Sequence, residues 1–147
     1  MDKPIHITIM SFAKWRMMSE NYPYDHIVIG FRSTNITYPQ IQFSPYCKAH
    51  LEINADDIQP YNALVGEKIF TKKDAKNILR VVKKYKKKIH HIIFQCDAGV
   101  SRSSAGAAAI SKILYGDDTW VYKSPRYIPN SHIYNAILKA HFGGYGD

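Results

Sequence analysis

The sequence predicts a three-layer α/β domain, with a central, mostly parallel sheet of about four strands and helices on both faces. Near-continuous apolar stretches at residues 26–31 and 89–94 are typical of strands buried on both faces of a sheet. A short helical segment at residues 12–19 separates the first two strands, which favours a parallel unit. A tight loop at residues 95–103 joins a buried strand to an alanine-rich helix. We expect a site at the carboxyl ends of the strands, where such sheets bind ligands.

The composition is that of an ordinary globular domain. Of the 147 residues, 46% are hydrophobic and 22% charged, so we expect one domain over residues 1–147, and a monomer. No apolar run is long enough to span a membrane. Two cysteines, at 47 and 96, argue against a disulfide framework and predict a reducing, cytoplasmic setting. The net charge of +8 favours anionic partners.

The first third of the chain predicts a strand, a helix and a second strand. β-Branched residues alternate over residues 5–10, and Ser11 is placed to cap the helix that follows. Residues 32–45 are rich in Ser, Thr, Asn, Pro and Tyr. They predict a loop with a short edge strand at 41–43.

A third strand is expected over residues 47–58, and it ends in two acids, Asp56 and Asp57. Strand ends in a parallel sheet are where ligands gather, so either carboxylate could serve a site. The plainer alternative is that both are solvated loop residues or a helix cap, because Asp is common in turns.

A long basic helix is expected to begin at Thr71, with Asp74 completing an approximate capping box. One face is apolar, formed by Ala75, Ile78, Leu79, Val82 and Tyr85. The remainder is basic, formed by Lys72, Lys73, Lys76, Arg80, Lys83, Lys84 and Lys87. We interpret this basic helix, residues 72–88, as a solvated surface, with anionic lipid or RNA as the alternative partner.

The loop at residues 95–103 carries the chemistry. Successive backbone N–H groups would form a cradle for a tetrahedral oxyanion; the residues are Asp97, Ala98, Gly99, Val100, Ser101 and Arg102. Cys96 at the base of this loop would be a thiolate nucleophile, stabilised by the same groups. The planar fork of Arg102 could hold two phosphate oxygens, and Ser103 could donate to the sulfur.

The rest of the chain predicts two helices. One runs from about Arg102 to Tyr115 and is ended by Gly116. The last begins near Ser131, with Asn130 as its cap and a weak site candidate. No metal is expected, because the adjacent pair His90-His91 would point to opposite faces of a strand.

The pattern Cys-x-Ala-Gly-x-Ser-Arg-Ser resembles the phosphate-binding signature of the cysteine-dependent dual-specificity phosphatases, in the protein tyrosine phosphatase superfamily. The histidine that usually precedes the cysteine is Gln95 here. The run Leu-x-Ile-x-Ala-Asp-Asp, which starts at Leu51, resembles the strand before that family's general-acid loop. The resemblance makes Asp57 the general acid, with Asp56 as the alternative.

This resemblance implies a hydrolase that removes phosphate from phosphotyrosine in proteins, and also from phosphoserine or phosphothreonine, through a cysteinyl-phosphate intermediate. It implies catalytic roles for Cys96, Arg102, Asp57 and Ser103, and no cofactor. The alternatives are a phosphoinositide or RNA 5′-phosphate substrate, or a catalytically weak phosphate-binding module. Cys47 is interpreted as a packing residue, with a resolving role in oxidation of Cys96 as the alternative.

Overall fold

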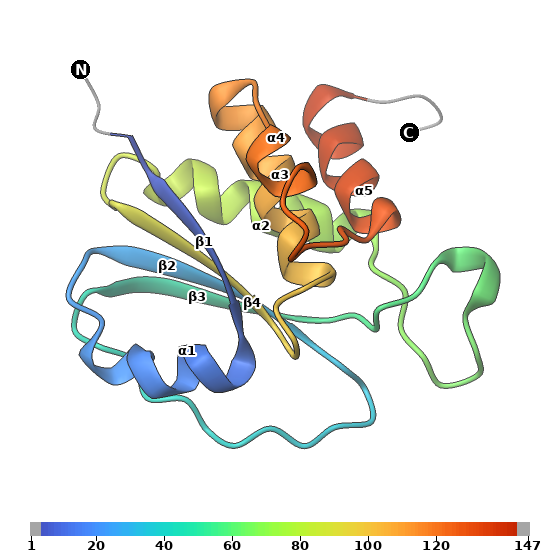
Figure 1. The fold of residues 1–147 in the computed structure, drawn as a ribbon, viewed down its shortest axis with the longest axis horizontal. Helices are drawn as coiled ribbons and strands as arrows, with labels where there is room; N and C mark the ends of the chain where they lie inside the picture. Colours follow the sequence, from blue (N-terminus) through green and yellow to red (C-terminus); the bar gives the residue numbers. More distant parts are fainter. Residues whose placement is uncertain (1–3, 144–147) are drawn as a thin grey trace.

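A parallel four-stranded sheet lies between two layers of helices in the computed structural model, which describes residues 4–143 (Figure 1). The strands are β1 (His6–Ser11), β2 (His26–Arg32), β3 (Cys47–Asn54) and β4 (His91–Cys96). The helices are α1 (Phe12–Met18), α2 (Lys72–Tyr85), α3 (Arg102–Tyr115), α4 (Thr119–Tyr122) and α5 (Ser131–Phe142). Short 3-10 turns occupy Ser19–Asn21 and Pro60–Asn62. The expected three-layer α/β architecture is confirmed.

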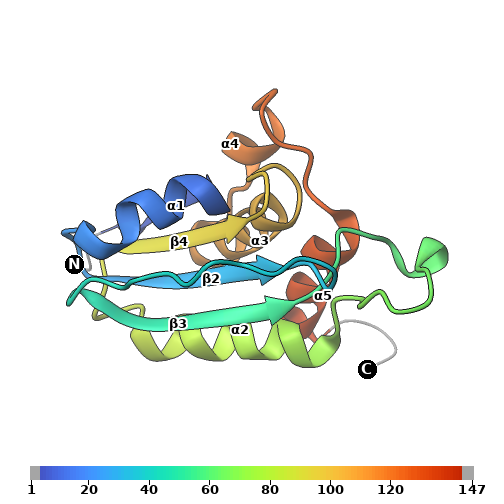
Figure 2. The same ribbon diagram turned by 90° about the horizontal axis from the view of Figure 1, so that it is seen from below.

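The order of the strands is β1-β4-β2-β3, and every neighbouring pair is parallel. All four carboxyl ends therefore meet at one edge of the sheet, which we call the carboxyl edge (Figure 2). The opposite edge, where the strands begin, is the amino edge. β2 is buried throughout, as its apolar run predicted, whereas β3 is an edge strand that alternates exposed and covered residues.

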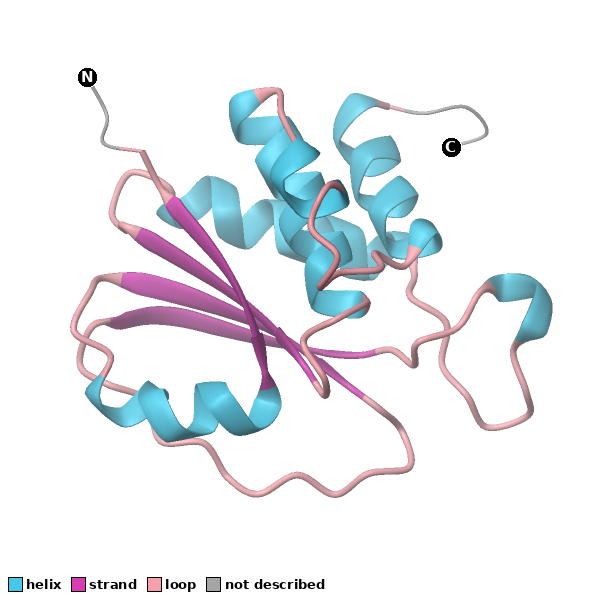
Figure 3. Ribbon diagram, viewed as in Figure 1, coloured by secondary structure: helices cyan, strands magenta, loops and turns pink. Residues whose placement is uncertain are grey.

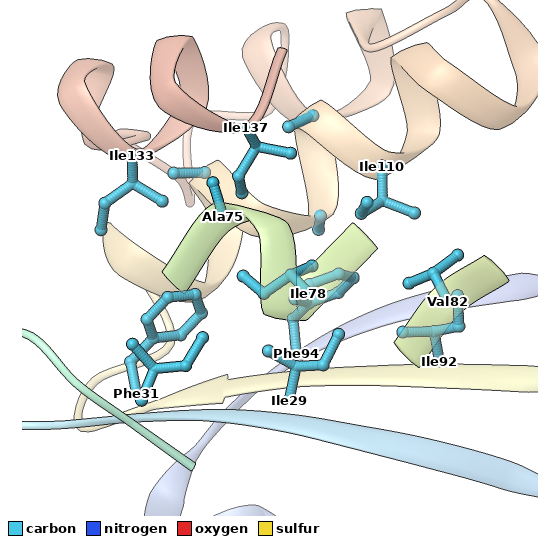
Figure 4. Close-up of a cluster of buried hydrophobic side chains, with 14 of the residues drawn as sticks. Ile29, Phe31, Ala75, Ile78, Val82, Ile92, Phe94, Ile110, Ile133 and Ile137 are labelled. Carbon is cyan, nitrogen blue, oxygen red and sulfur yellow. The ribbon is translucent and has the colours of Figure 1, made fainter. Parts of the chain in front are cut away.

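Helices α2, α3 and α5 cover one face of the sheet with the larger of two hydrophobic cores. Figure 4 shows side chains from the sheet and all three helices meeting there; the labelled residues are Ile29, Phe31, Ala75, Ile78, Val82, Ile92, Phe94, Ile110, Ile133 and Ile137. Helix α3 lies especially close to β4, since a Cβ added at Gly106 would come within 2.8 Å of the Phe94 ring. This packing fixes the start of α3 beside the end of β4.

Helix α1 covers the other face over a smaller core, in which Trp15 packs near Val28 and Ile93. The helix begins where Ser11 accepts a hydrogen bond from the Lys14 N–H at 3.1 Å, as predicted. The short length of α1 leaves part of this face to the irregular segment 33–46 (Figure 3).

Three sequence expectations need correction. The segment 33–46 contains no strand at 41–43; Ile41 is instead buried in the smaller core. Strand β3 ends at Asn54 and not at 58, because the chain turns away to let Asp56 accept backbone N–H groups. The short helix α4 was not expected. The predicted caps of α2, α3 and α5 are all present: the Thr71–Asp74 capping box, left-handed Gly116, and Asn130.

Candidate active site

A tight loop joins the buried end of β4 to the start of α3 at the carboxyl edge. Gly99 in this loop has a φ of +71°, and a Cβ there would lie 2.7 Å from the backbone nitrogen of Ser11. A side chain at this position would therefore be strained and would push the loop away from the end of β1. Ser101 is the N-cap residue of α3, but its side chain does not accept a hydrogen bond from the first turn of the helix. The backbone N–H groups of that turn are therefore open to an anion bound in the loop.

Cys96 lies at the base of the loop. Its side chain is buried, and its Sγ is 3.0 Å from the Oγ of Ser103, which is buried in the first turn of α3. A hydroxyl at this distance can donate to a thiolate, the contact that the sequence predicted for Ser103.

Arg102 is held across the end of the sheet. Its guanidinium is buried, and Nη1 donates to the backbone oxygen of Ala55 at 2.9 Å and to the Oγ of Ser33 at 3.0 Å. Nη2 donates to Oδ2 of Asp97 at 2.9 Å. The Nε–H has no hydrogen-bond partner among the described residues. Nε and Nη2 share one edge of the guanidinium, so a buried donor edge suited to a bidentate oxyanion is only partly used.

The side chain of Asp97 organises the loop in a way that sequence reasoning missed. Its carboxylate accepts from the Tyr38 hydroxyl at 2.5 Å and from the Ser33 Oγ at 2.7 Å, besides Arg102. Burial acts to raise the pKa of Asp97, but these hydrogen bonds and the nearby cation outweigh it and lower that pKa below its ordinary value. Asp97 therefore stays ionised and ties the segment 33–46 to Arg102.

Asp57 lies at the rim of the same loop. Its Oδ1 accepts from the Ser101 Oγ at 2.7 Å and from the Nδ2 of Asn130 at 2.9 Å, while the residue stays exposed. Asn130 thus caps α5 and also touches the expected general acid. The structure brings Asp57 and Asn130 to the loop that carries Cys96 and Arg102.

Asp56 points away from this group. It is buried and accepts from the N–H and Oγ1 of Thr34 at 3.0 and 2.8 Å and from the Lys68 N–H at 2.8 Å. Burial favours a higher pKa, but the hydrogen bonds from Lys68 and Thr34 prevail, so the pKa of Asp56 is lowered. A carboxylate that stays ionised and is fully engaged is poorly suited to donate a proton.

Gln95, which precedes the nucleophile, supports a neighbouring cation. Its Oε1 accepts from Nη1 of Arg32 at 2.7 Å inside the protein. The Arg32 guanidinium lies 4.9 Å from the ring centroid of Phe12 and 5.0 Å from that of Tyr38. The side chain of Gln95 therefore contacts Arg32, and no hydrogen bond among the described residues joins it to the Cys96 sulfur.

Cys47 lies too far from Cys96 to pair with it. Cys47 is level with His26 and, through it, with His91, at the amino edge. Cys96 lies five residues along the strand from His91, which is roughly 16 Å at the usual rise per residue. A disulfide needs Cα atoms about 4.4–6.8 Å apart, so the resolving role is wrong for this fold.

A metal-binding cluster and a membrane-spanning helix are two further features that would bear on function. Among residues 4–143, no group of three or more His, Cys, Asp or Glu side chains is arranged to hold a metal ion. In the same part of the chain, no helix is long and apolar enough to cross a membrane.

Neither a protein-family model nor a curated protein matches the sequence. Solved structures do match. Human DUSP28 aligns with 15% identity and a TM-score of 0.57, over 93% of this chain and 92% of that one. DUSP15 aligns with 17% identity and a TM-score of 0.56, over 90% and 81% of the two chains. PTPMT1 aligns with 10% identity and a TM-score of 0.55, over 94% and 90%.

At identities of 10–17%, the similarity to these structures establishes the fold alone. The roles of individual residues have to be argued from their contacts in this chain. The matches extend over 81–92% of these solved chains, and in this chain the loop between β4 and α3 carries the pattern Cys-x-Ala-Gly-x-Ser-Arg-Ser. The chain has the fold of the dual-specificity phosphatases of the protein tyrosine phosphatase superfamily.

Proposed function

We propose that this protein is a cysteine-dependent phosphatase that hydrolyses phosphomonoesters, with phosphotyrosine in proteins as the first candidate substrate and phosphoserine or phosphothreonine as further ones. The observation that carries the proposal is that one loop holds both the Cys96 thiol, beside the Ser103 hydroxyl, and the buried guanidinium of Arg102. The Nε–H of that guanidinium has no hydrogen-bond partner among the described residues. A buried donor without an acceptor is costly, and a phosphate oxygen in the loop would satisfy it.

In the first step, the Cys96 thiolate attacks phosphorus in line and forms a sulfur–phosphorus bond as the bond from phosphorus to the ester oxygen breaks. Asp57, held at the rim by Ser101 and Asn130, gives its proton to the departing oxygen. The N–H groups of residues 97–102 and the Arg102 fork stabilise the equatorial oxygens, over which the transition-state charge is spread.

In the second step, water attacks phosphorus in the cysteinyl-phosphate and the sulfur–phosphorus bond breaks. The Asp57 carboxylate, now unprotonated, accepts a proton from that water. The thiolate leaves with its charge stabilised by the Ser103 hydroxyl, 3.0 Å away. Inorganic phosphate departs. The enzyme is then back in its starting state, with a proton on Asp57 and a thiolate at Cys96.

A phosphoinositide is the second candidate substrate. Another solved structure of PTPMT1 shows that protein in complex with PI(5)P, so a phosphoinositide is compatible with a protein of this fold. The net charge of +8 suits either kind of phosphate. An RNA 5′-phosphate and a catalytically weak phosphate-binding module are the remaining alternatives.

We also propose that the chain is a single domain, residues 1–147, and that it works as a monomer in a reducing, cytoplasmic setting. The two cysteines are both unpaired. The basic surface of α2 lies opposite its buried residues Ala75, Ile78 and Val82, and we interpret it as solvated, with anionic lipid or RNA as alternative partners.

The test is turnover by the purified protein of an aryl phosphate, a phosphotyrosyl peptide and a phosphoinositide. We expect release of inorganic phosphate from at least the first two, and a phosphate adduct on Cys96 in acid-quenched samples analysed by mass spectrometry. Binding of a phosphate analogue without release from any of the three substrates would favour the weak-module alternative.

A further inference from the structure

A cavity of about 680 Å³ lies beside the candidate active site, between the segment 33–46 and the face of the sheet that α1 covers. Three alternate residues of β3 share one face of that strand and line the cavity: His50, Glu52 and Asn54. Apolar side chains from α1 and the segment line it as well; they are Phe12, Ile36, Ile41 and Phe43. The volume is within the range of small-ligand pockets, so the cavity can hold a side chain of a partner molecule.

Arg32, at the carboxyl end of β2, is fixed in the wall of this cavity. Its side chain is only 8% exposed, and Nη1 donates to the Oε1 of Gln95 at 2.7 Å and to a backbone oxygen at 3.2 Å. The rings of Phe12 and Tyr38 lie against the guanidinium. Gly30 leaves room for it, since a Cβ there would come within 2.7 Å of Nη1. The direction of the remaining donors of Arg32 is therefore set by packing.

These remaining donors meet the cavity without a hydrogen bond. Nε and Nη2 form the edge of the guanidinium that can hold an oxyanion bidentately. Neither donates to any residue in the range 4–143, and the ion pair of Arg32 with Glu52, 3.8 Å from Nη2 to Oε1, is too long for a hydrogen bond. The side chain of Glu52 is 56% exposed, so it can turn into water at little cost. The edge is thus open to a carboxylate from outside the chain.

The charges in and around the cavity suit a single negative charge. The lining carries two cations and one acid, namely Arg32, Lys68 and Glu52. Behind the lining, the charge of Asp97 is paired with Arg102 at 2.9 Å, and Asp56 adds one negative charge. With His50 uncharged the sum is zero, and a ligand carboxylate that takes the place of Glu52 leaves it unchanged. A phosphate group would add a second negative charge, so a carboxylate fits better.

The cavity and the phosphate loop share a wall. The Tyr38 ring packs on Arg32, while its hydroxyl donates to Asp97, which accepts from Arg102. Ser33 lines the cavity and its Oγ accepts from Nη1 of Arg102 at 3.0 Å. A substrate with its phosphate on Arg102 can therefore reach Arg32 with a neighbouring group.

We infer that this cavity is a carboxylate subsite, in which Arg32 binds an acidic side chain that flanks the phosphorylated residue of a protein substrate. The carboxylate accepts from Nε and Nη2 and displaces Glu52 into water. The identity of the substrate rests on the proposed function, whereas the anion site on Arg32 does not depend on catalysis. The subsite favours acidic phosphoproteins over phosphate esters that lack a second acid.

The first test is binding of benzoate to the full chain, followed through the arginine Nε–H signals in NMR spectra. We expect benzoate to shift the signal of Arg32, assigned from through-bond spectra. Glu52→Gln removes the competing carboxylate and should tighten binding about three- to tenfold. Glu20→Gln is the matched control, because it removes the same charge at an exposed position in the turn Ser19–Asn21 and should leave the affinity unchanged. An Arg32 signal that ignores benzoate, an unchanged affinity in Glu52→Gln, or an equal gain in Glu20→Gln would overturn the anion site.

The second test identifies the source of the carboxylate. The Cys96→Ser chain is titrated with phosphotyrosyl peptides that carry glutamate, glutamine or phosphoserine at one flanking position at a time. We expect glutamate at one position to bind about three- to tenfold tighter than glutamine, and tighter than phosphoserine. Arg32→Lys, which keeps the charge and loses the fork, should remove that gain, and Glu52→Gln should enlarge it, so the test survives if Arg32→Lys does not fold.

The two tests separate the inference from the proposed function. Tighter binding of phosphoserine than of glutamate would contradict the choice of a carboxylate. If benzoate shifts the Arg32 signal but no peptide position responds, the site takes a free carboxylate and the substrate assignment is wrong. Failure of every phosphopeptide to bind would contradict the proposed function and the substrate with it, while the benzoate result stands on its own.

Discussion

Buried and half-buried ionisable groups at the two edges of the sheet have different kinds of neighbours. At the carboxyl edge, Asp56, Asp97 and Arg102 are each held by charged or polar partners, so their charges are kept in place. At the amino edge, His26 and His91 lie among aromatic rings, and burial lowers the pKa of both. Hydrogen bonds thus favour the charged form of the two carboxylates, whereas burial favours the neutral form of the two histidines. Arg32, at the carboxyl edge, is an exception, because burial lowers its pKa as well.

The contacts of His91 show how the amino edge works. Its Nδ1 lies 2.9 Å from the Tyr22 hydroxyl, and the Tyr24 ring stacks on it with centroids 4.6 Å apart. His26 is fully buried and its ring lies against Trp15 and Tyr22. These rings stabilise neutral histidines through packing. From this comparison we expect substitutions at Cys96 and Asp57 to change the proposed activity, and substitutions of the amino-edge histidines to change the pH dependence of stability; the predictions below test that division.

The largest effect is expected from Cys96→Ser. Hydrolysis of an aryl phosphate should fall by about four orders of magnitude or more, because the nucleophile is lost. Binding of a phosphate analogue should remain measurable, since Arg102 and the loop N–H groups are untouched, and the thermal midpoint should move little. Calorimetry and steady-state kinetics check the two properties separately. Activity equal to that of the parent would remove Cys96 from the mechanism.

The neighbouring acids Asp56 and Asp57 provide a sharper test within the carboxyl edge. Asp57→Asn should slow hydrolysis of phosphotyrosine by about two to four orders of magnitude and remove the basic limb of the pH–rate profile. A substrate with a much better leaving group needs less protonation, so its first step should slow far less. The measurement is kcat for a series of aryl phosphates.

Asp56→Asn is the matched control for Asp57→Asn. It disturbs the acceptor for Thr34 and Lys68, so it should lower the free energy of unfolding by about 1–3 kcal/mol and leave the leaving-group dependence unchanged. If Asp56→Asn shows the leaving-group-dependent loss instead, the general acid is Asp56.

The local signals in the sequence predicted most of the fold because each acts over a few residues. The capping box at Thr71 and the left-handed Gly116 fix helix ends through contacts within one turn. The loop pattern likewise placed Ser103 beside Cys96, since both are fixed by a strand and the helix that follows it. The contacts of Ser33 and Tyr38 were not predictable, because they come from a segment without periodicity.

Asp97 illustrates the same limit at a single residue. An acid directly after the expected nucleophile is a signal in the sequence, but its residue type alone does not say which side chains its carboxylate contacts. Its side chain acquires a role through Tyr38, which lies 59 positions away in the chain. Long-range polar networks of this kind depend on how two irregular segments meet, which periodicity does not encode.

A smaller effect is expected from Tyr38→Phe, which keeps the ring near Arg32 and removes the hydroxyl that donates to Asp97. The same hydroxyl also accepts from the Ser33 N–H at 2.8 Å, so the substitution removes two hydrogen bonds. Their loss should weaken the hold on Arg102 and raise KM for an aryl phosphate about three- to tenfold, with little change in kcat. The pKa of Asp97 should rise towards its ordinary value, so the acid limb of the kcat/KM profile should move to higher pH. Tyr46→Phe, near the amino edge, is the control, and an unchanged profile in Tyr38→Phe would contradict the positioning role.

The smallest effect concerns pH and the amino edge. The folded-state pKa values of His26 and His91 lie below the ordinary value of 6.5, so the unfolded chain binds more protons as the pH falls through that range. Stability should therefore be fully present above about pH 6.5 and fall below it, by up to about 1.4 kcal/mol per pH unit for each proton taken up on unfolding.

The neighbours of His91 determine how His91→Gln should act. Burial is the main cause of its lowered pKa, and His6, His90 and His26 add repulsion between positive charges. His91→Gln removes one proton-binding group, so the difference in unfolding free energy between about pH 5 and pH 7.5 should narrow. His141→Gln, in an exposed position at the end of α5, should leave that difference as it is. Hydrolysis of an aryl phosphate near neutral pH should be unchanged by His91→Gln, because His91 lies at the far end of β4 from Cys96; a parallel loss of activity would show that the two edges are not independent.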